Sequence, residues 1–213
     1  MNEQQDFSYI KRNLDDIRAR AAAAAAASPY GQPYELLLAT KYATADEINY
    51  AHALGVNKIG ENRVQSLLEK YDALHRDGLD IHFIGSLQKN KVKYIIDKVS
   101  MIESLDSLPL AAEIERQAAK QDKVMDCLIE VNIGREAQKG GIMPEDAADF
   151  AEKAALFPHI RLCGIMTMAP KCTDEADYRK YFRESYHIFI DICEKKLHNV
   201  DRHVLSMGMS QSF

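Results

Sequence analysis

Short apolar runs alternate with segments of helical periodicity from residue 35 to the end of the chain. A short continuous apolar run bounded by turn residues is typical of a buried strand, whereas apolar residues that recur every three or four positions predict a helix. The sequence therefore predicts seven strands. They correspond to residues 36–40, 58–60, 82–85, 101–104, 127–131, 162–166 and 203–208.

Helical segments separate these strands along the chain. They are expected at residues 45–54, 64–74, 92–96, 108–119, 144–156 and 181–197. Repeated strand–helix units predict a parallel sheet with helices outside it, and the pattern alone leaves open a closed barrel and an open, doubly wound sheet. Ser107 is expected to cap the helix that begins near Pro109.

A further helix is predicted before the first strand. Ile10, Leu14, Ile17 and Ala21 recur at helical spacing, and an alanine tract continues the helix to about Ser28. No change of composition, linker or block of charge divides the rest of the chain. We therefore predict a single domain over residues 1–213, in which residues 1–34 form the N-terminal helix and a linker.

Composition and charge restrict the class of protein. The chain has 213 residues, a net charge of -5 and a pI near 5.8 without a strongly basic stretch, which argues against nucleic acid as a partner. The polar N-terminus lacks the order of a signal peptide, and no apolar run could span a membrane. Four cysteines show neither metal-ligand nor C-x-x-C spacing. These features predict a cytoplasmic protein with reduced thiols and no metal.

Lys41 follows the first predicted strand, in the stretch ELLLATKY at residues 35–42. A lysine at the end of a buried strand either marks the exit of the chain into solvent or takes part in chemistry. In parallel α/β folds, functional loops gather at the carboxyl ends of the strands. The residues at those ends are 41, 60–62, 85–88, 104–107, 132–134, 166–167 and 206–210.

These strand ends supply one lysine together with glycines, amides and hydroxyls, and they contain no paired carboxylates or nucleophile–histidine–acid set. Such a set suits a carbonyl cofactor that carries a phosphate. Desolvation at the end of a buried strand would lower the pKa of the lysine from about 10.4 and supply the neutral amine that attacks an aldehyde. Ser206, Gly208 and Ser210 could present hydroxyls and N–H groups to the phosphate.

Seven segments carry a resemblance to a known family. They are LLLATKYAT, GENRVQ, HFIGSLQKNKVKYI, ESLDS, LIEVNIGREAQKGGI, LCGIMTMAP and LSMGMS. In order and spacing over residues 8–210 the chain resembles the pyridoxal 5'-phosphate homeostasis proteins, a family with the TIM-type barrel fold of the alanine racemase N-terminal domain. The resemblance implies that Lys41 is the Schiff-base lysine and that Ser206 and Gly208 belong to the phosphate site. It also implies that Asn62 lies close to the cofactor and that Met166 forms a wall of the same pocket.

Two functions follow from the resemblance. The first is a non-catalytic, monomeric carrier that holds pyridoxal 5'-phosphate (PLP) on Lys41 and can pass it to PLP-dependent apoenzymes. The second is a PLP-dependent enzyme such as an amino-acid racemase, which needs a second acid/base group on the opposite face of the substrate. Tyr42 is the nearest phenol, but adjacent residues of a strand point to opposite faces. The carrier is therefore the favoured hypothesis.

The chain departs from the family at its C-terminus. Family members usually continue past the SMGMS motif through a helix to a last strand with the sequence Arg-Ile-Gly-Thr, which completes the phosphate site. This sequence ends at Phe213. We therefore expect a truncated barrel whose last strand and helix are missing, with unpaired sheet edges.

Overall fold

The computed structural model describes residues 6–195, 197 and 204–208. Contacts divide the chain into two compact units, residues 1–81 and residues 82–213, which are called the N-terminal unit and the C-terminal unit below. Strand β3 (Asp80–Phe83) contains the boundary between them.

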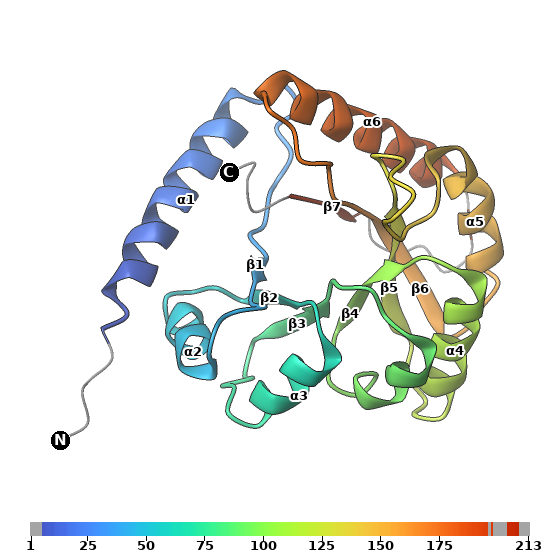
Figure 1. Cartoon of the computed structure of the whole chain (residues 1–213), viewed down its shortest axis with the longest axis horizontal. Helices are drawn as coiled ribbons and strands as arrows, with labels where there is room; N and C mark the ends of the chain where they lie inside the picture. Colours follow the sequence, from blue (N-terminus) through green and yellow to red (C-terminus); the bar gives the residue numbers. More distant parts are fainter. Residues whose placement is uncertain (1–5, 196, 198–203, 209–213) are drawn as a thin grey trace. The chain divides into compact units, whose positions relative to one another are not determined.

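The N-terminal unit contains two parallel strands that precede β3, and three helices (Figure 1). Its elements are α1 (Ser8–Ala27), β1 (Leu38–Ala39), α2 (Ala45–Ala53), β2 (Lys58–Glu61) and α3 (Val64–Tyr71). In the register of β1 with β2, Leu38 is opposite Ile59 and Ala39 is opposite Gly60. Leu14 of α1 packs with Ala51 and Val56 in the apolar core of this unit.

The first strand differs from the prediction. Of residues 36–40 only Leu38 and Ala39 form a strand, and neither of these two is fully buried. The reason is that Leu36 and Leu38 pack against the cluster around Leu14, so only one side of the run is covered. Thr40 alone is completely buried, and its N–H donates a hydrogen bond of 2.9 Å to Gly60 O. The expectation of a buried strand at residues 36–40 is therefore wrong for β1.

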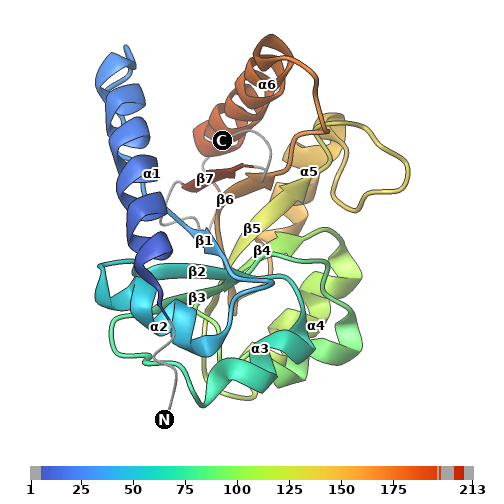
Figure 2. The ribbon, with the colours of Figure 1, turned by 60° about the vertical axis from the view of Figure 1, so that its left-hand side comes forward.

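The C-terminal unit contains parallel strands that neighbour one another in the order of the sequence, from β3 to β7. After β3 they are β4 (Met101–Leu105), β5 (Met125–Val131), β6 (Ile160–Thr167) and β7 (Val204–Met207). Helices α4 (Leu108–Ala119), α5 (Ala147–Ala154) and α6 (Glu175–Glu194) lie on the outer side of β4, β5 and β6 (Figures 1 and 2). Two short 3₁₀ helices, η1 (Lys89–Tyr94) and η2 (Pro144–Asp146), complete this unit in the described residues.

Seven strands are thus present in the described residues, as the apolar runs predict, but three helical details differ. The segment predicted at residues 92–96 is the 3₁₀ helix η1. Helix α6 begins at Glu175, well before residue 181, because the Asp174 side chain accepts a hydrogen bond of 2.9 Å from the Asp177 N–H and caps the helix. Ser107 stands at the N-cap of α4 but makes no side-chain capping hydrogen bond.

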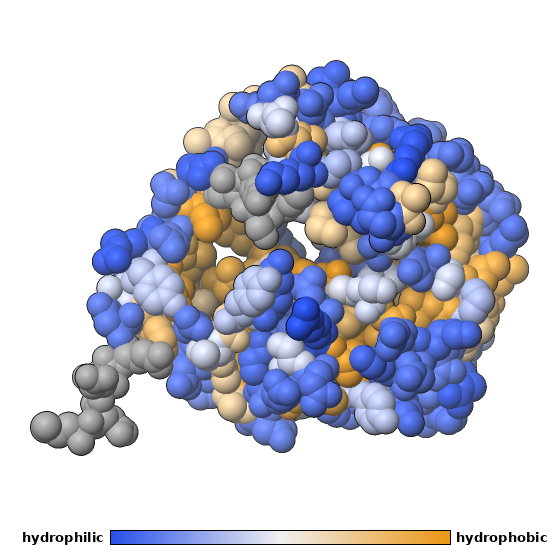
Figure 3. All heavy atoms as spheres, viewed as in Figure 1, coloured by the Kyte–Doolittle hydropathy of each residue, from blue (hydrophilic) through white to orange (hydrophobic). Residues whose placement is uncertain are grey.

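The outer surface over α4, α5 and α6 is mainly hydrophilic (Figure 3). This distribution agrees with amphipathic helices that turn their apolar residues toward the strands. Across the part of the chain that the structure describes, no helix combines the length and apolar character needed to cross a membrane.

Candidate functional site

Lys41 occupies a tight turn directly after β1. The Ala43 N–H donates a hydrogen bond of 3.0 Å to Thr40 O, which closes a β-turn with Lys41 at its second position. The Lys41 side chain is exposed, and its Nζ lies 5.1 Å from the centre of the Tyr42 ring. The burial expected for this amine is therefore not found, because the chain leaves the short strand β1 immediately. The amine is open to a ligand.

Asn62 follows β2 at the position that corresponds to Lys41 after β1. Since Ala39 is opposite Gly60, Lys41 and Asn62 each lie two residues beyond a registered pair of neighbouring strands. The Asn62 Oδ1 is buried and has no hydrogen-bond partner among the described residues. A buried polar atom left without a partner costs about 1–3 kcal/mol. The Asn62 amide oxygen thus suits a ligand that supplies a hydrogen-bond donor.

A cluster of buried and partly buried polar side chains lies next to the Lys41 turn. Thr40 Oγ1 donates a hydrogen bond of 2.7 Å to Glu61 Oε1, and Lys70 Nζ forms an ion pair with the same oxygen. Lys70 Nζ also donates to Thr40 O at 2.9 Å and to Ala43 O at 3.1 Å. Sequence reasoning named Glu61 among the strand-end residues 60–62 but did not connect it with Lys70, because the two residues lie on β2 and α3.

Met166 and Ser206 are direct neighbours in the C-terminal unit, where the register of β6 with β7 pairs them. Met166 is buried and packs with Met101, Leu128 and Cys163. Gly208 follows β7 and is exposed. The predicted residues therefore form two sets, Lys41 and Asn62 in one unit and these three in the other. Ser210 lies outside the described residues.

The Ser206 hydroxyl is already bonded within the protein. Its Oγ donates to Glu103 Oε2 at 2.6 Å, and His82 Nδ1 lies 2.6 Å from Glu103 Oε1. Glu103 and His82 are both buried. Because a serine hydroxyl has one hydrogen, Ser206 in this arrangement offers a phosphate only lone pairs. Main-chain N–H groups near Gly208 are better suited to that anion.

Glu130 is a candidate residue that sequence reasoning missed. It is opposite Met166 in the register of β5 with β6, so Glu130, Met166 and Ser206 form one row across three neighbouring strands and point to the same side. Burial, assisted by the negative charge of Asp106, raises the pKa of Glu130 to about 7. A carboxyl group with this pKa exchanges its proton near neutral pH. The signal in the sequence is a charged residue within the apolar run 127–131.

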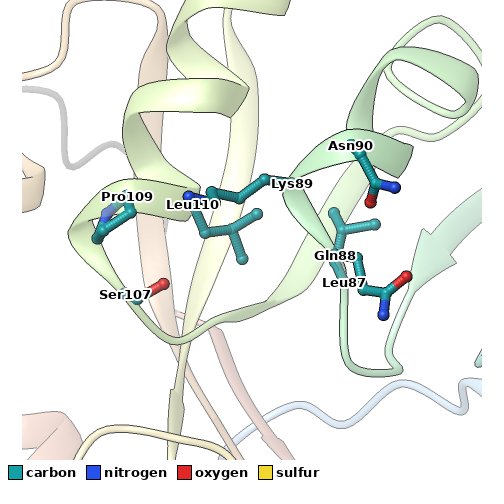
Figure 4. A pocket seen from close by; sticks show the side chains of 7 residues that line it. All are labelled: Leu87, Gln88, Lys89, Asn90, Ser107, Pro109 and Leu110. Carbon is teal, nitrogen blue, oxygen red and sulfur yellow. The ribbon is translucent and has the colours of Figure 1, made fainter.

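An open depression of about 530 Å³ lies elsewhere in the C-terminal unit, where β3 and β4 lead into η1 and α4. Figure 4 shows Lys89 extending from η1 toward Leu110 at the start of α4. The residues that line it are Leu87, Gln88, Lys89, Asn90, Ser107, Pro109 and Leu110. None of the five predicted site residues is among them. The described residues also include no group of three or more His, Cys, Asp or Glu side chains that could hold a metal ion.

Comparison with known proteins identifies relatives over most of the chain. Residues 6–213 match the family model described as "Alanine racemase, N-terminal domain". The chain is 42% identical over 179 residues to the pyridoxal phosphate homeostasis protein of Aquifex aeolicus, a match that covers 84% of this chain and 78% of that protein.

Two solved structures extend the comparison. A structure described as "an unknown protein from Bifidobacterium adolescentis" has a TM-score of 0.90 and 32% identity, covering 99% of this chain and 90% of that one. PipY of Synechococcus elongatus with PLP bound has a TM-score of 0.75 and 25% identity, covering 91% of this chain and 89% of that one.

The strand pattern alone left open a barrel and an open, doubly wound sheet, and these matches decide for the barrel type. The predicted fold class, a TIM-type α/β barrel of the alanine racemase N-terminal type, is confirmed by the family match and by the structural neighbours. The chain belongs to the pyridoxal phosphate homeostasis proteins, within the alanine racemase N-terminal domain family.

Proposed function

We propose that this protein is a non-catalytic carrier that binds PLP covalently through Lys41 and takes part in PLP homeostasis in the cytoplasm. The names of its relatives and the PLP-bound structure of PipY support this function. The free cysteines support the location. We further propose that the protein acts as a monomer and passes PLP to apoenzymes that require it.

One observation carries the proposal. Lys41 presents an exposed amine from a closed turn, and at the equivalent step of the neighbouring strand Asn62 has a buried amide oxygen without a partner among the described residues. The Lys41 amine can form a covalent bond with PLP, and the unpaired Asn62 Oδ1 can accept a hydrogen bond from an N–H or O–H group of the cofactor. When bound, PLP supplies an aldehyde that condenses with an amine and a phosphate that binds to N–H groups.

The other predicted residues have supporting roles. Met166 offers an apolar wall within the row, between Glu130 and Ser206. The main chain at Gly208 can approach a phosphate closely, because no side chain stands there. Ser206 is held by Glu103 and contributes to the shape of this region rather than a hydrogen for the phosphate.

Covalent labelling tests the role of Lys41. The protein is incubated with PLP, reduced with borohydride and mapped by peptide mass spectrometry, with Lys41→Ala as the control. We expect the adduct on Lys41 in the parent protein and a loss of specific labelling in the variant. An adduct on another lysine, or the same labelling of Lys41→Ala at other positions, would contradict the assignment.

Turnover separates the carrier from a racemase. The PLP-loaded protein is incubated with L-alanine and with several other amino acids, and the D-enantiomers are measured. We expect none above the rate of free PLP, because Tyr42, the phenol that contacts Lys41 in the described residues, is 89% exposed to solvent. Racemisation at ordinary enzyme rates would refute the carrier, whereas recovery of activity by an apoenzyme mixed with the loaded protein would support it.

A further inference from the structure

All three hydrogens of the Lys70 ammonium group form hydrogen bonds within the protein. Its Nζ donates to Thr40 O at 2.9 Å and to Ala43 O at 3.1 Å, and it pairs with Glu61 Oε1. An ammonium group has three N–H donors, so no hydrogen of Lys70 remains for another acceptor. The two carbonyls belong to the first and last residues of the turn that carries Lys41. Lys70 therefore connects the two ends of that turn.

Glu61 holds this ammonium group in place from the strand side. The residue is 1% exposed, and its Oε1 accepts hydrogen bonds from both Thr40 Oγ1 and Lys70 Nζ. Thr40 is also bound through its main-chain N–H to Gly60 O at 2.9 Å. Strand β2, helix α3 and the turn are thus joined through one carboxylate and one ammonium group.

Such an arrangement is costly to build for stability alone. Removing charges from water is unfavourable, and apolar side chains of similar size often serve the core as well or better. What the pair provides is geometry, because charged groups with several directed hydrogen bonds hold the backbone in one conformation. The backbone held here is that of Thr40 to Ala43.

We propose that Lys70 and Glu61 are positioning residues for Lys41, which fix the turn so that the Lys41 amine is presented in one place to its ligand. This inference rests on the proposed function of Lys41 as the PLP-binding residue. A covalent ligand that must also be held at its phosphate needs its anchoring amine within a fraction of an ångström of one position. The two lysines have separate tasks, since the amine of Lys41 is exposed and that of Lys70 is fully bonded.

The double variant Lys70→Met/Glu61→Leu tests the inference, because it removes both charges together and leaves neither buried alone. The matched control is Lys11→Met/Asp15→Leu, which removes an exposed ion pair of 2.6 Å from α1 in the same unit. PLP affinity is measured by absorbance titration, and the rate of adduct formation by borohydride trapping. We expect at least about tenfold weaker binding and slower trapping in the first variant and no change in the control.

Two further measurements separate positioning from folding. Hydrogen exchange of the Ala43 amide, which donates to Thr40 O, is expected to be faster in the double variant while its circular dichroism spectrum is retained. Lys70→Arg keeps the charge but presents a planar fork in place of three radiating donors, so we expect intermediate PLP affinity. If the double variant does not fold, the PLP affinity and trapping rate of Lys70→Arg and Thr40→Val are compared with those of the parent protein instead.

The outcomes distinguish the two proposals. If the parent protein forms no adduct on Lys41, the proposed function fails and the positioning role fails with it. If the parent protein is labelled on Lys41 and the folded double variant binds PLP within twofold of it, the positioning role alone is refuted. Weaker binding, slower trapping and faster exchange of Ala43 together support it.

Discussion

Glu130→Gln is predicted to change the pH dependence of stability. Glu130 lies within strand β5, and burial together with the charge of Asp106 raises its pKa from 4.5 to about 7. Between these two pH values the folded protein keeps a proton that the unfolded chain has released, so the free energy of unfolding falls as the pH rises. Below pH 4.5 Glu130 is protonated in both the folded and the unfolded state. Above pH 7 it is ionised in both states, and the folded protein then bears the full free-energy cost of burying its charge. Glutamine is never ionised and avoids this cost.

The size of the effect follows from the two pKa values. Each unit of difference corresponds to about 1.4 kcal/mol, so the interval from 4.5 to about 7 sets an upper limit of about 3.5 kcal/mol. Glu130 retains some contact with solvent, which reduces the value. We therefore expect Glu130→Gln to be more stable than the parent protein by about 1–3 kcal/mol at pH 8 and to lose this advantage at pH 4.5.

Urea denaturation at a series of pH values between 4.5 and 8.5 measures this difference. Asp106→Asn is the first control, because it removes the second cause of the shift and should weaken the pH dependence of the parent protein. Glu69→Gln on the exposed side of α3 is the second, and it should change nothing. A stability difference between Glu130→Gln and the parent protein that is constant over this range would refute the reasoning.

Three further substitutions are expected to lower the free energy of unfolding, each measured by urea denaturation. Gly164→Ala should cost about 3 kcal/mol or more, because a Cβ would lie 1.9 Å from Val204 O and Gly164 has a φ of +139°. Ser185→Ala should cost about 1–2 kcal/mol, since the buried Ser185 Oγ contacts Thr167 Oγ1 at 3.0 Å. Lys123→Met should cost a similar amount, because Nζ donates to the Ile96 and Val99 carbonyls, each at 2.9 Å.

The apolar pattern predicts the strands well, for a physical reason. Strands such as β5 and β6 are buried on both faces, and their sequences are therefore continuous apolar runs. The same signal overstates β1, because a run of leucines is equally compatible with packing on one side against α1. It also cannot tell the 3₁₀ helix η1 from an α-helix, since the two periods differ little over six residues.

The candidate site was predictable only in part. Lys41 and Asn62 stand at strand ends, where the rule for parallel sheets directs attention. Lys70 and Glu103 were not found, and Glu61 stood among the strand-end residues 60–62 without a role, because their importance lies in contacts that no spacing in the sequence reveals. Lys70 is nine residues from Glu61, and Ser206 is 103 residues from Glu103. Only the folded chain brings such partners together.

A buried glutamate supports a predicted site residue in each unit. Glu61, on β2, binds Thr40 and Lys70 beside the Lys41 turn, and Glu103, on β4, binds the hydroxyl of Ser206. Both carboxylates are almost completely buried, at 1% and 2% exposure, which is unusual for glutamate. Glu61 is bonded through Oε1 alone, since its Oε2 has no hydrogen-bond partner among the described residues. Neutralising either one leaves its partners unsatisfied and frees the residue it holds. Substitutions at these glutamates should therefore disturb the site through the geometry of its neighbours, even where no ligand touches them.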